Sequence, residues 1–264
     1  MSAAAYIACN LRNASRARGA ALALAAPAFA LMWAGGVASH WLGWAEARDG
    51  RLASLFLALA GLVVLLGARG RGAAASLGWV ALLGFAVELA GSRLGVPFGG
   101  YSYTAVLQPQ LLGVPVVMGF AWMALVAFAC DAAGRLRLGV WATAAAGALL
   151  TTAADLVIDP LAANQFGYWS WEGGGAYYGV PFSNFVGWFV TAFAACRILA
   201  PRQRANPWAG FVGGAVLLFF ALTALAHTLL PVALLGFGLC GARLLAAATA
   251  GGSSPTPARA REGR

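Results

Sequence analysis

Eight apolar stretches, each close to the length of a membrane span, constrain this 264-residue chain more than any other feature. A hydrocarbon layer about 30 Å thick needs roughly 20 helical residues to cross it. We expect helices over residues 20–42, 52–68, 73–91, 112–130, 138–158, 180–197, 208–226 and 229–248. The continuous hydrophobicity of these stretches differs from the short alternating segments of a membrane β-barrel. The predicted fold class is an all-α, polytopic membrane protein with eight transmembrane helices.

The composition supports this class. Hydrophobic residues make up 61% of the chain and charged residues only 9%, whereas soluble domains average about 25% charged residues. We expect a single integral membrane domain over residues 1–250 and a disordered polar tail over 251–264. The cysteines form no CxxC or CxxH pattern, so we expect reduced, packing thiols rather than a disulfide framework or a metal site. They are Cys9, Cys130, Cys196 and Cys240.

The net charge of +9 comes from arginine alone, because the chain has no lysine. A basic balance can indicate nucleic-acid binding, but these arginines lie in short loops between apolar stretches, which is typical of topology signals and contact with anionic lipids. Counted on alternate sides of the eight spans, fourteen arginines fall on the side of the termini and three on the other. This excess predicts a multi-pass protein of the cell membrane with both termini in the cytoplasm.

Four acidic residues lie near the same predicted face of the membrane, the outer one. Glu88 and Asp155 sit inside apolar stretches, and Asp159 and Glu172 lie just beyond one. A carboxylate within a span is costly, so it needs a partner, a water-filled cavity or a function. The aromatic loops fall on the same face, whereas the cytoplasmic loops are short and basic. We therefore expect the functional site at the outer face.

Asp155 and Asp159 are four residues apart and share one helical face, about 6 Å from each other. Two carboxylates this close in a medium of low dielectric constant do not ionise together easily, so one should hold a proton. A protonated carboxyl group can act as a general acid. Alternatively, Asp159-Pro160 simply ends the helix, with Asp159 in solvent. A two-carboxylate metal site is a further alternative, although no His or Cys lies close in sequence to complete it.

Glu88 lies about one turn inside the outer end of its helix, and Arg93 follows five residues later. If Arg93 folds back to pair with Glu88, the glutamate is ionised and structural. Without that pair, Glu88 is a second candidate proton donor, and the sequence leaves both alternatives open. Asn164, Gln165 and Asn184 are candidates to place a water molecule, and Asn184 is the strongest because it enters a helix.

An internal repeat covers residues 73–199. The loop sequence FGGYSY at 98–103 recurs 68 residues later as FGYWSW at 166–171. GVP at 113–115, with a tryptophan and a cysteine at fixed distances after it, recurs 66 residues later at 179–181. The combined spacing favours duplication over coincidence. We therefore predict that the third and fourth helices, and the fifth and sixth, are parallel copies related by an axis along the membrane normal.

Both copies of the loop are rich in aromatic residues and glycine. Such loops form an aromatic belt at the lipid headgroups or line a pocket, where each desolvated aromatic face stabilises a cation by up to about 2 kcal/mol. His40 and His227 end helices at the same face and are expected as interfacial anchors rather than ligands. The expected substrate-binding residues are Arg93, Tyr101, Tyr103, Trp169, Trp171, Tyr178 and Asn184.

Several motifs occur in a fixed order between residues 80 and 190. They are Glu88-x8-Pro97-Phe98-Gly99-x-Tyr101-x-Tyr103, Leu112-Gly113-Val114-Pro115, Asp155-x3-Asp159-Pro160, Gly167-x-Trp169-x-Trp171, Tyr177-Tyr178-Gly179-Val180-Pro181 and Asn184-Phe185-x-Gly187-Trp188. This pattern resembles the membrane carotenoid-biosynthesis proteins of the CruF type. The resemblance implies a cofactor-free carotenoid hydratase acting on acyclic ψ-ends, such as those of γ-carotene, lycopene or bisanhydrobacterioruberin. The implied product is a tertiary alcohol at C1 or C1′.

The candidate residues fit the chemistry that this resemblance implies. Hydration of a trisubstituted alkene protonates the less substituted carbon, and water then captures the tertiary cation, so the site needs a shielded acid and a positioned water. The expected catalytic residues are Asp155, Glu88 and Asp159, with either Asp155 or Glu88 as the proton donor. A membrane transporter of a small or lipophilic solute is the main alternative, because parallel repeats and intramembrane acids also occur in transporters. Against it, the acids cluster at one face.

The charge bias makes the predicted topology testable. Reporter fusions after residue 137 should show cytoplasmic activity, and fusions near residue 170 should show extracytoplasmic activity, because the arginine excess fixes the orientation of the spans. The opposite pattern would overturn the argument that the acids share the outer face.

Overall fold

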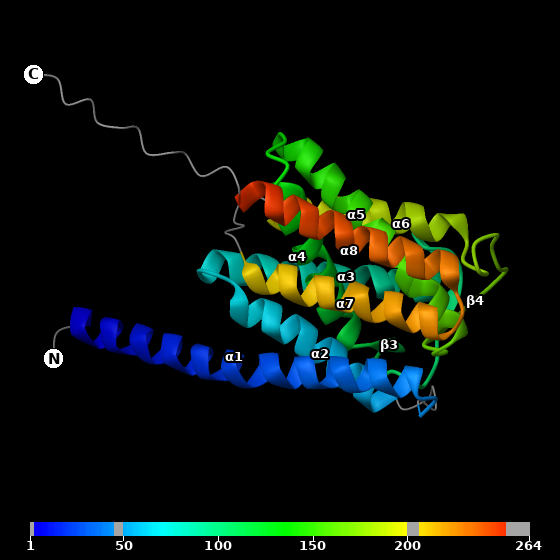
Figure 1. Ribbon diagram of the computed structural model, residues 1–264. Coiled ribbons are helices and arrows are strands. Elements are labelled where there is room, and N and C mark those ends of the chain that lie inside the picture. The colour runs from blue at the N-terminus through cyan, green and yellow to red at the C-terminus, as the bar shows by residue number, and fades with distance from the viewer. Residues whose placement is uncertain (1–2, 45–49, 200–205, 252–264) are drawn as a thin grey trace, which may run out of the picture.

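The computed structural model describes residues 3–44, 50–199 and 206–251. The helices run side by side in one bundle (Figure 1). They are α1 (Ala3–Trp41), α2 (Gly50–Gly67), α3 (Arg71–Leu94), α4 (Val117–Gly134), α5 (Val140–Asn164), α6 (Phe182–Leu199), α7 (Pro207–Ala226) and α8 (Leu230–Gly251). Seven of the described helices are long and apolar enough to cross a membrane, and α8 carries a shorter apolar stretch, Leu230–Leu245. The predicted all-α, polytopic fold is confirmed. The expected tail beyond residue 251 and the side chain of Cys9 lie outside the described part.

The helix ends follow from local sequence signals. Gly95 adopts the left-handed conformation after α3, with φ of 69°, and its N–H donates to the Gly91 oxygen, as a glycine C-cap does. At the start of α7, the Asn206 side chain accepts a hydrogen bond from the Trp208 N–H, and Pro207 occupies the first turn, where its missing N–H costs nothing.

The helix predicted from residue 112 begins five residues later, because a hairpin precedes it. Strand β2 (Gln110–Leu111) pairs antiparallel with β3 (Val114–Pro115). The two residues between the strands, Leu112 and Gly113, have φ angles of 55° and 83°. Positive φ at both positions is the geometry that tight two-residue hairpin turns require. The GVP motif thus forms a turn and a strand, and α4 starts after it.

Pro160 lies inside α5 and does not end the helix. Because proline has no N–H, the backbone oxygen of Leu156 lacks its usual helical partner. The Tyr177 hydroxyl donates to that oxygen at 2.8 Å and replaces the missing bond. The helix therefore continues to Asn164, and Asp159 lies within it, 1% exposed, so the alternative of a solvated Asp159 at a helix end is wrong.

Helix α4 is the centre of the bundle. In its span 78% of the residues are buried, against 50% or less in each of the other candidate spans. It packs against α2, α3, α5 and α7. The large hydrophobic core therefore surrounds α4, and the lipid-facing surface belongs mainly to the other helices.

The two aromatic loops meet as a small sheet. Strand β1 (Tyr101–Tyr103) pairs antiparallel with β4 (Trp169–Trp171), and Ser102 lies opposite Ser170 at the centre of the register. These serines are equivalent residues of the two copies, 68 positions apart. A residue that pairs with its own equivalent lies close to a two-fold axis between the copies.

Two further pairs of equivalent residues meet across the same axis. The rings of Trp122 and Trp188 stack with centroids 4.1 Å apart, and Cys130 and Cys196 form a disulfide. The duplication predicted from spacing thus corresponds to a paired arrangement in space. The expectation of reduced thiols is wrong for this pair, because the axis brings equivalent cysteines of α4 and α6 together. Cys240 is a free thiol, as expected.

The hydrogen bond from Tyr177 to Leu156 predicts that substitutions at Tyr177 and Pro160 affect stability in a coupled way. Tyr177→Phe should lower the free energy of unfolding by about 1–3 kcal/mol, because the Leu156 oxygen loses its donor in apolar surroundings. In a Pro160→Ala background the same substitution should cost less, since residue 160 then supplies an N–H. Thermal unfolding of the four purified proteins in detergent measures both losses, and equal losses would contradict this account of α5.

Candidate functional site

Glu88 is buried in α3 and accepts three side-chain hydrogen bonds. Trp122 Nε1 donates to its Oε1 at 2.7 Å, and the Tyr103 hydroxyl donates to its Oε2 at 2.7 Å. The Tyr101 hydroxyl also donates to Oε2. The guanidinium of Arg93 does not fold back onto Glu88, because it donates to a backbone oxygen 19 residues along the chain. Aromatic donors therefore satisfy this carboxyl group in place of the arginine considered from sequence.

The two tyrosines of this cluster stay protonated. Burial raises the pKa of Tyr101, and the nearby Glu88 charge raises it further. Burial, followed by the same charge, also raises the pKa of Tyr103 well above its ordinary value. Both hydroxyls are therefore available as donors at physiological pH.

Asp155 and Asp159 form a second cluster on one face of α5, and each is 1% exposed. Asn184 Nδ2 bridges them, donating to Asp155 Oδ2 at 2.7 Å and to Asp159 Oδ2 at 2.9 Å. The indole nitrogens of Trp169 and Trp171 donate to Asp159 Oδ1 at 2.8 and 3.1 Å. Within the described residues, Asp159 thus accepts three N–H donors and Asp155 accepts one.

In both clusters, aromatic side chains of a strand donate hydrogen bonds to a carboxyl group of the helix that precedes the strand. The tyrosines of β1 donate to the carboxyl group of α3, and the tryptophans of β4 donate to that of α5. The antiparallel register brings Tyr101 against Trp171, with ring centroids 5.1 Å apart, and Tyr103 against Trp169, at 6.0 Å. The pairing of the loops therefore places the clusters beside each other.

The second copy carries a polar set that the first copy lacks. Asp159 corresponds to Gly91 at the 68-residue spacing, and Asn184 corresponds to Met118 at the 66-residue spacing. The bridged carboxylate pair is thus a property of α5 and α6. Chemistry that needs two neighbouring carboxylates belongs to this half of the repeat.

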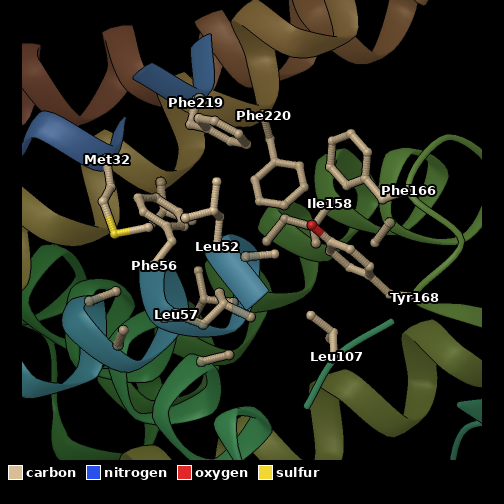
Figure 2. A pocket seen from close by; sticks show the side chains of 18 of the residues that line it. Met32, Leu52, Phe56, Leu57, Leu107, Ile158, Phe166, Tyr168, Phe219 and Phe220 are labelled. Carbon is tan, nitrogen blue, oxygen red and sulfur yellow. The ribbon is translucent and has the colours of Figure 1, made fainter. Parts of the chain in front are cut away.

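A cavity of about 760 Å³ lies between α1, α2, α4, α5 and α7 (Figure 2). Its wall is mostly aliphatic and aromatic, and small residues such as Gly36, Ala60 and Ala124 leave the space. Small-molecule sites usually have volumes of about 300–1,000 Å³. This cavity is therefore large enough for a ligand, and its wall suits an apolar one.

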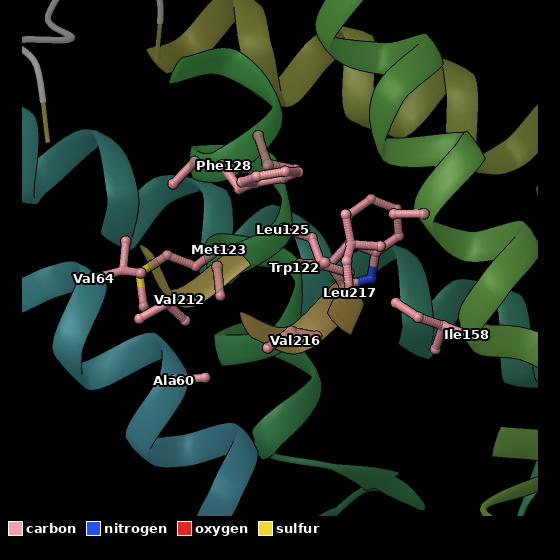
Figure 3. Packing of buried hydrophobic residues seen from close by; sticks show 14 of the residues in the cluster. Ala60, Val64, Trp122, Met123, Leu125, Phe128, Ile158, Val212, Val216 and Leu217 are labelled. Carbon is pink, nitrogen blue, oxygen red and sulfur yellow. The ribbon is translucent and has the colours of Figure 1, made fainter. Parts of the chain in front are cut away.

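Neither aspartate lines this cavity, but two tryptophans connect it to the carboxylates. Trp169 lines the cavity and donates to Asp159. Trp188 lines it as well and stacks on Trp122, the indole that donates to Glu88. Trp122 itself is fixed in the packed core around α4 (Figure 3). The two lining indoles thus belong both to the cavity wall and to the surroundings of the acids.

Tyr178, expected from sequence to bind substrate, and Glu172, an acid of the same predicted face, both lie outside the cavity wall. Glu172 is exposed, and Ser102 Oγ donates to it at 3.3 Å. Tyr178 packs edge-on against Tyr177 with ring centroids 4.9 Å apart, and its backbone oxygen accepts the Asn164 amide at 2.8 Å. Neither Glu172 nor Tyr178 lines the cavity or donates to the buried carboxylates.

The two histidines form a pair between the ends of α1 and α7. His40 Nδ1 lies 3.3 Å from His227 Nε2, and the His40 ring stacks on Phe166 with centroids 5.1 Å apart. His40 also lines the cavity. Among the described residues, no group of three or more His, Cys, Asp and Glu side chains is placed to hold a metal ion.

Sequence reasoning missed two residues of this region and one buried acid away from it. Trp188 and Tyr168 both line the cavity, although the repeat motif contains the first and the aromatic loop contains the second. Asp131 is a further buried carboxylate, which accepts hydrogen bonds from Arg135 and Arg243 at 3.0 Å each. The four-residue spacing from Asp131 to Arg135 is a signal for such an ion pair. Asp131 lies near the far end of α4 and connects α4 to α8, so its role is structural.

Comparison with known proteins identifies a family and a relative. A sequence family described as carotenoid biosynthesis protein matches residues 50–250. A bisanhydrobacterioruberin hydratase from Haloarcula japonica is 37% identical over 120 residues, which cover 43% of this chain and 40% of that protein. The match thus spans less than half of the relative's length. No solved structure matches this chain.

The Asn184 amide that bridges the aspartates predicts that substitutions at Asn184 and Asp155 affect stability in a coupled way. Asn184→Met, which introduces the residue type of the equivalent first-copy position, removes a donor from both carboxylates and should lower the free energy of unfolding by about 1.5–3 kcal/mol. In an Asp155→Asn background the loss should shrink, because the new amide can donate to Asp159. Melting temperatures of the four proteins of this double-mutant cycle test the coupling, and additive losses would show that the bridge does not couple the pair.

Proposed function

Because this chain belongs to the carotenoid biosynthesis protein family, we propose that it is a carotenoid hydratase, which adds water to the terminal double bond of an acyclic carotenoid end. The relative from Haloarcula japonica is named as a hydratase of bisanhydrobacterioruberin, and this name supports the reaction class. The observation that carries the proposal is a buried, bridged carboxylate pair beside an apolar cavity of about 760 Å³. A shielded acid and an apolar chamber are what the hydration of an unactivated alkene requires.

The cavity suits one end of a linear polyene. Along α2 its lining residues run from Leu52 to Ala60, a rise of about 12 Å in a helix. A carotenoid rod is about as long as the hydrocarbon layer is thick, about 30 Å. The cavity therefore takes an end group with the adjoining part of the polyene, while the rest of the substrate lies among the lipids.

The proton donor in this proposal is Asp155. Three N–H donors on Asp159 suit an ionised carboxylate, because charge-assisted hydrogen bonds are the stronger ones, whereas the described partners of Asp155 supply one such donor. Two carboxylates that share one amide do not readily carry two charges in an apolar medium. Glu88 has both oxygens occupied by aromatic donors. The proton of the pair is therefore assigned to Asp155, and Glu88 is given a positioning role.

The reaction needs only this acid and a water molecule. The Asp155 carboxyl group transfers its proton to C2 of the terminal alkene, which leaves a tertiary cation at C1. The oxygen of a water molecule bonds to C1, and the proton that this water then loses returns to the Asp155 carboxylate. The ionised Asp159 and the faces of Trp169 and Trp188 stabilise the cation, each aromatic face by up to about 2 kcal/mol. Asp155 does not itself line the cavity, so in this proposal the alkene end passes the lining indoles to reach it.

Expression in cells that accumulate lycopene tests this function. The wild-type protein should produce pigments whose mass has increased by one water, as measured by mass spectrometry of extracted carotenoids. Asp155→Asn should abolish this product without loss of membrane-inserted protein, because an amide keeps the shape of the acid but does not deliver the proton. Glu172→Gln is the matched control, because this exposed carboxylate lies outside the site and its loss should leave hydration unchanged.

The outcomes separate the alternatives. Unchanged pigment masses with the wild-type protein would contradict the hydratase function and agree with a transporter. An active Asp155→Asn together with an inactive Glu88→Gln would move the donor assignment to Glu88. If both variants remain active, the mechanism based on buried acids is wrong.

A further inference from the structure

Tyr168 is held rigidly at the edge of the cavity. Its backbone N–H donates to the Ala162 oxygen at 2.9 Å, and its backbone oxygen accepts the Thr104 N–H at 3.0 Å. Its ring packs against Phe166, with centroids 5.2 Å apart. These contacts anchor the backbone of Tyr168 to the end of α5 and to the segment after β1, and pack its ring on one side.

The Tyr168 hydroxyl has no hydrogen-bond partner among the described residues, and Figure 2 shows its oxygen pointing into the cavity. The other polar groups of the wall are mostly engaged. Ser39 Oγ donates to a backbone oxygen in its own helix, His40 pairs with His227, and Trp169 donates to Asp159. Burial raises the pKa of Tyr168, so its hydroxyl stays neutral and both donates and accepts.

An unpartnered hydroxyl facing an apolar cavity is destabilising, and a bound water or ligand oxygen removes this penalty. The indole nitrogen of Trp188, which also lines the cavity, has no hydrogen-bond partner among the described residues either. A buried water usually needs two to four polar partners, and the Tyr168 hydroxyl and the Trp188 indole N–H are two lining groups free to supply them. The next residue after Tyr168 is Trp169, which lines the same cavity and donates to Asp159, so Tyr168 and the indole bound to the carboxylate belong to one segment of the wall.

We propose that Tyr168 is a positioning residue, which holds the water molecule that captures the tertiary cation. The inference rests on the hydratase function proposed above and adds to it the group that places the nucleophile. After Asp155 has protonated C2, the oxygen of the water held by Tyr168 forms the bond to C1. The proton released from this water goes to the Asp155 carboxylate that the first step left, so no further reactant is needed.

The cation has a second fate when this water is misplaced. It loses a proton from C2 or from a methyl group on C1, and an alkene forms again. In D₂O the acid delivers a deuteron, so this return leaves deuterium in the recovered alkene without adding water. The partition between alcohol and deuterated alkene therefore reports on the placement of the water separately from the protonation step.

Tyr168→Phe removes the hydroxyl and keeps the ring. Membranes that contain the variant, supplied with lycopene in D₂O, should form the alcohol about tenfold more slowly, because losing the hydrogen bond that orients the nucleophile raises the barrier by about 1.4 kcal/mol. Deuterium should still enter the recovered alkene. Glu172→Gln is the control, since this exposed carboxylate neither lines the cavity nor contacts the buried acids, and it should behave as the wild type in both measurements.

Each result decides the proposal. Slower alcohol formation with continued deuterium entry supports it. Alcohol formation at the wild-type rate in Tyr168→Phe overturns it and leaves the hydratase function intact. Loss of both alcohol and deuterium also overturns it, because the hydroxyl would then serve the protonation step or the fold. If the wild-type protein forms no alcohol, the hydratase function fails first and this inference fails with it.

Discussion

The free-energy cost of burying three carboxyl groups in an apolar bundle governs the arrangement around them. An unsatisfied acid in such surroundings is strongly destabilising, so Glu88, Asp155 and Asp159 need donors. The loops after α3 and α5 supply most of these donors, and they reach the acids only by folding back against the helices. Phenol and indole groups suit this task because each combines an apolar body with one polar donor. The acids are thereby satisfied without opening the bundle to water.

Duplication explains where the chain repeats itself and where it does not. A residue on the two-fold axis meets its own equivalent, so one residue type must fit itself, as the stacked Trp122 and Trp188 do. Positions away from the axis have no such restriction, and there the copies differ. Met118 faces apolar surroundings where the second copy has the bridging Asn184. The residues on the axis are therefore alike in the two copies, whereas the bridged carboxylate pair belongs to the second copy.

The sequence predicted the helices and the burial of Glu88 and Asp155 because both depend on local hydrophobicity. It misjudged features that depend on distant partners. From sequence alone Pro160 suggests a helix end, because the Tyr177 hydroxyl that replaces its missing N–H comes from a distant segment. The cysteines suggest separate thiols, because only the folded arrangement brings Cys130 to Cys196. The cavity was not predictable either, because the sequence does not show whether small residues such as Ala60 pack closely or leave space. Without the cavity, Tyr168 was one more residue of an aromatic loop.

The separation of the acids from the cavity has a consequence for any hydration at this site. A cavity with an apolar wall accepts a polyene but holds water poorly, since water is stable only where polar partners gather. The bridged aspartates lie behind Trp169, whose indole nitrogen already serves Asp159. In the proposed mechanism each turnover therefore uses a water held by a polar group of the wall. That requirement limits side reactions of the cation, because a reactive carbon enclosed by aromatic faces meets one oxygen, in one orientation.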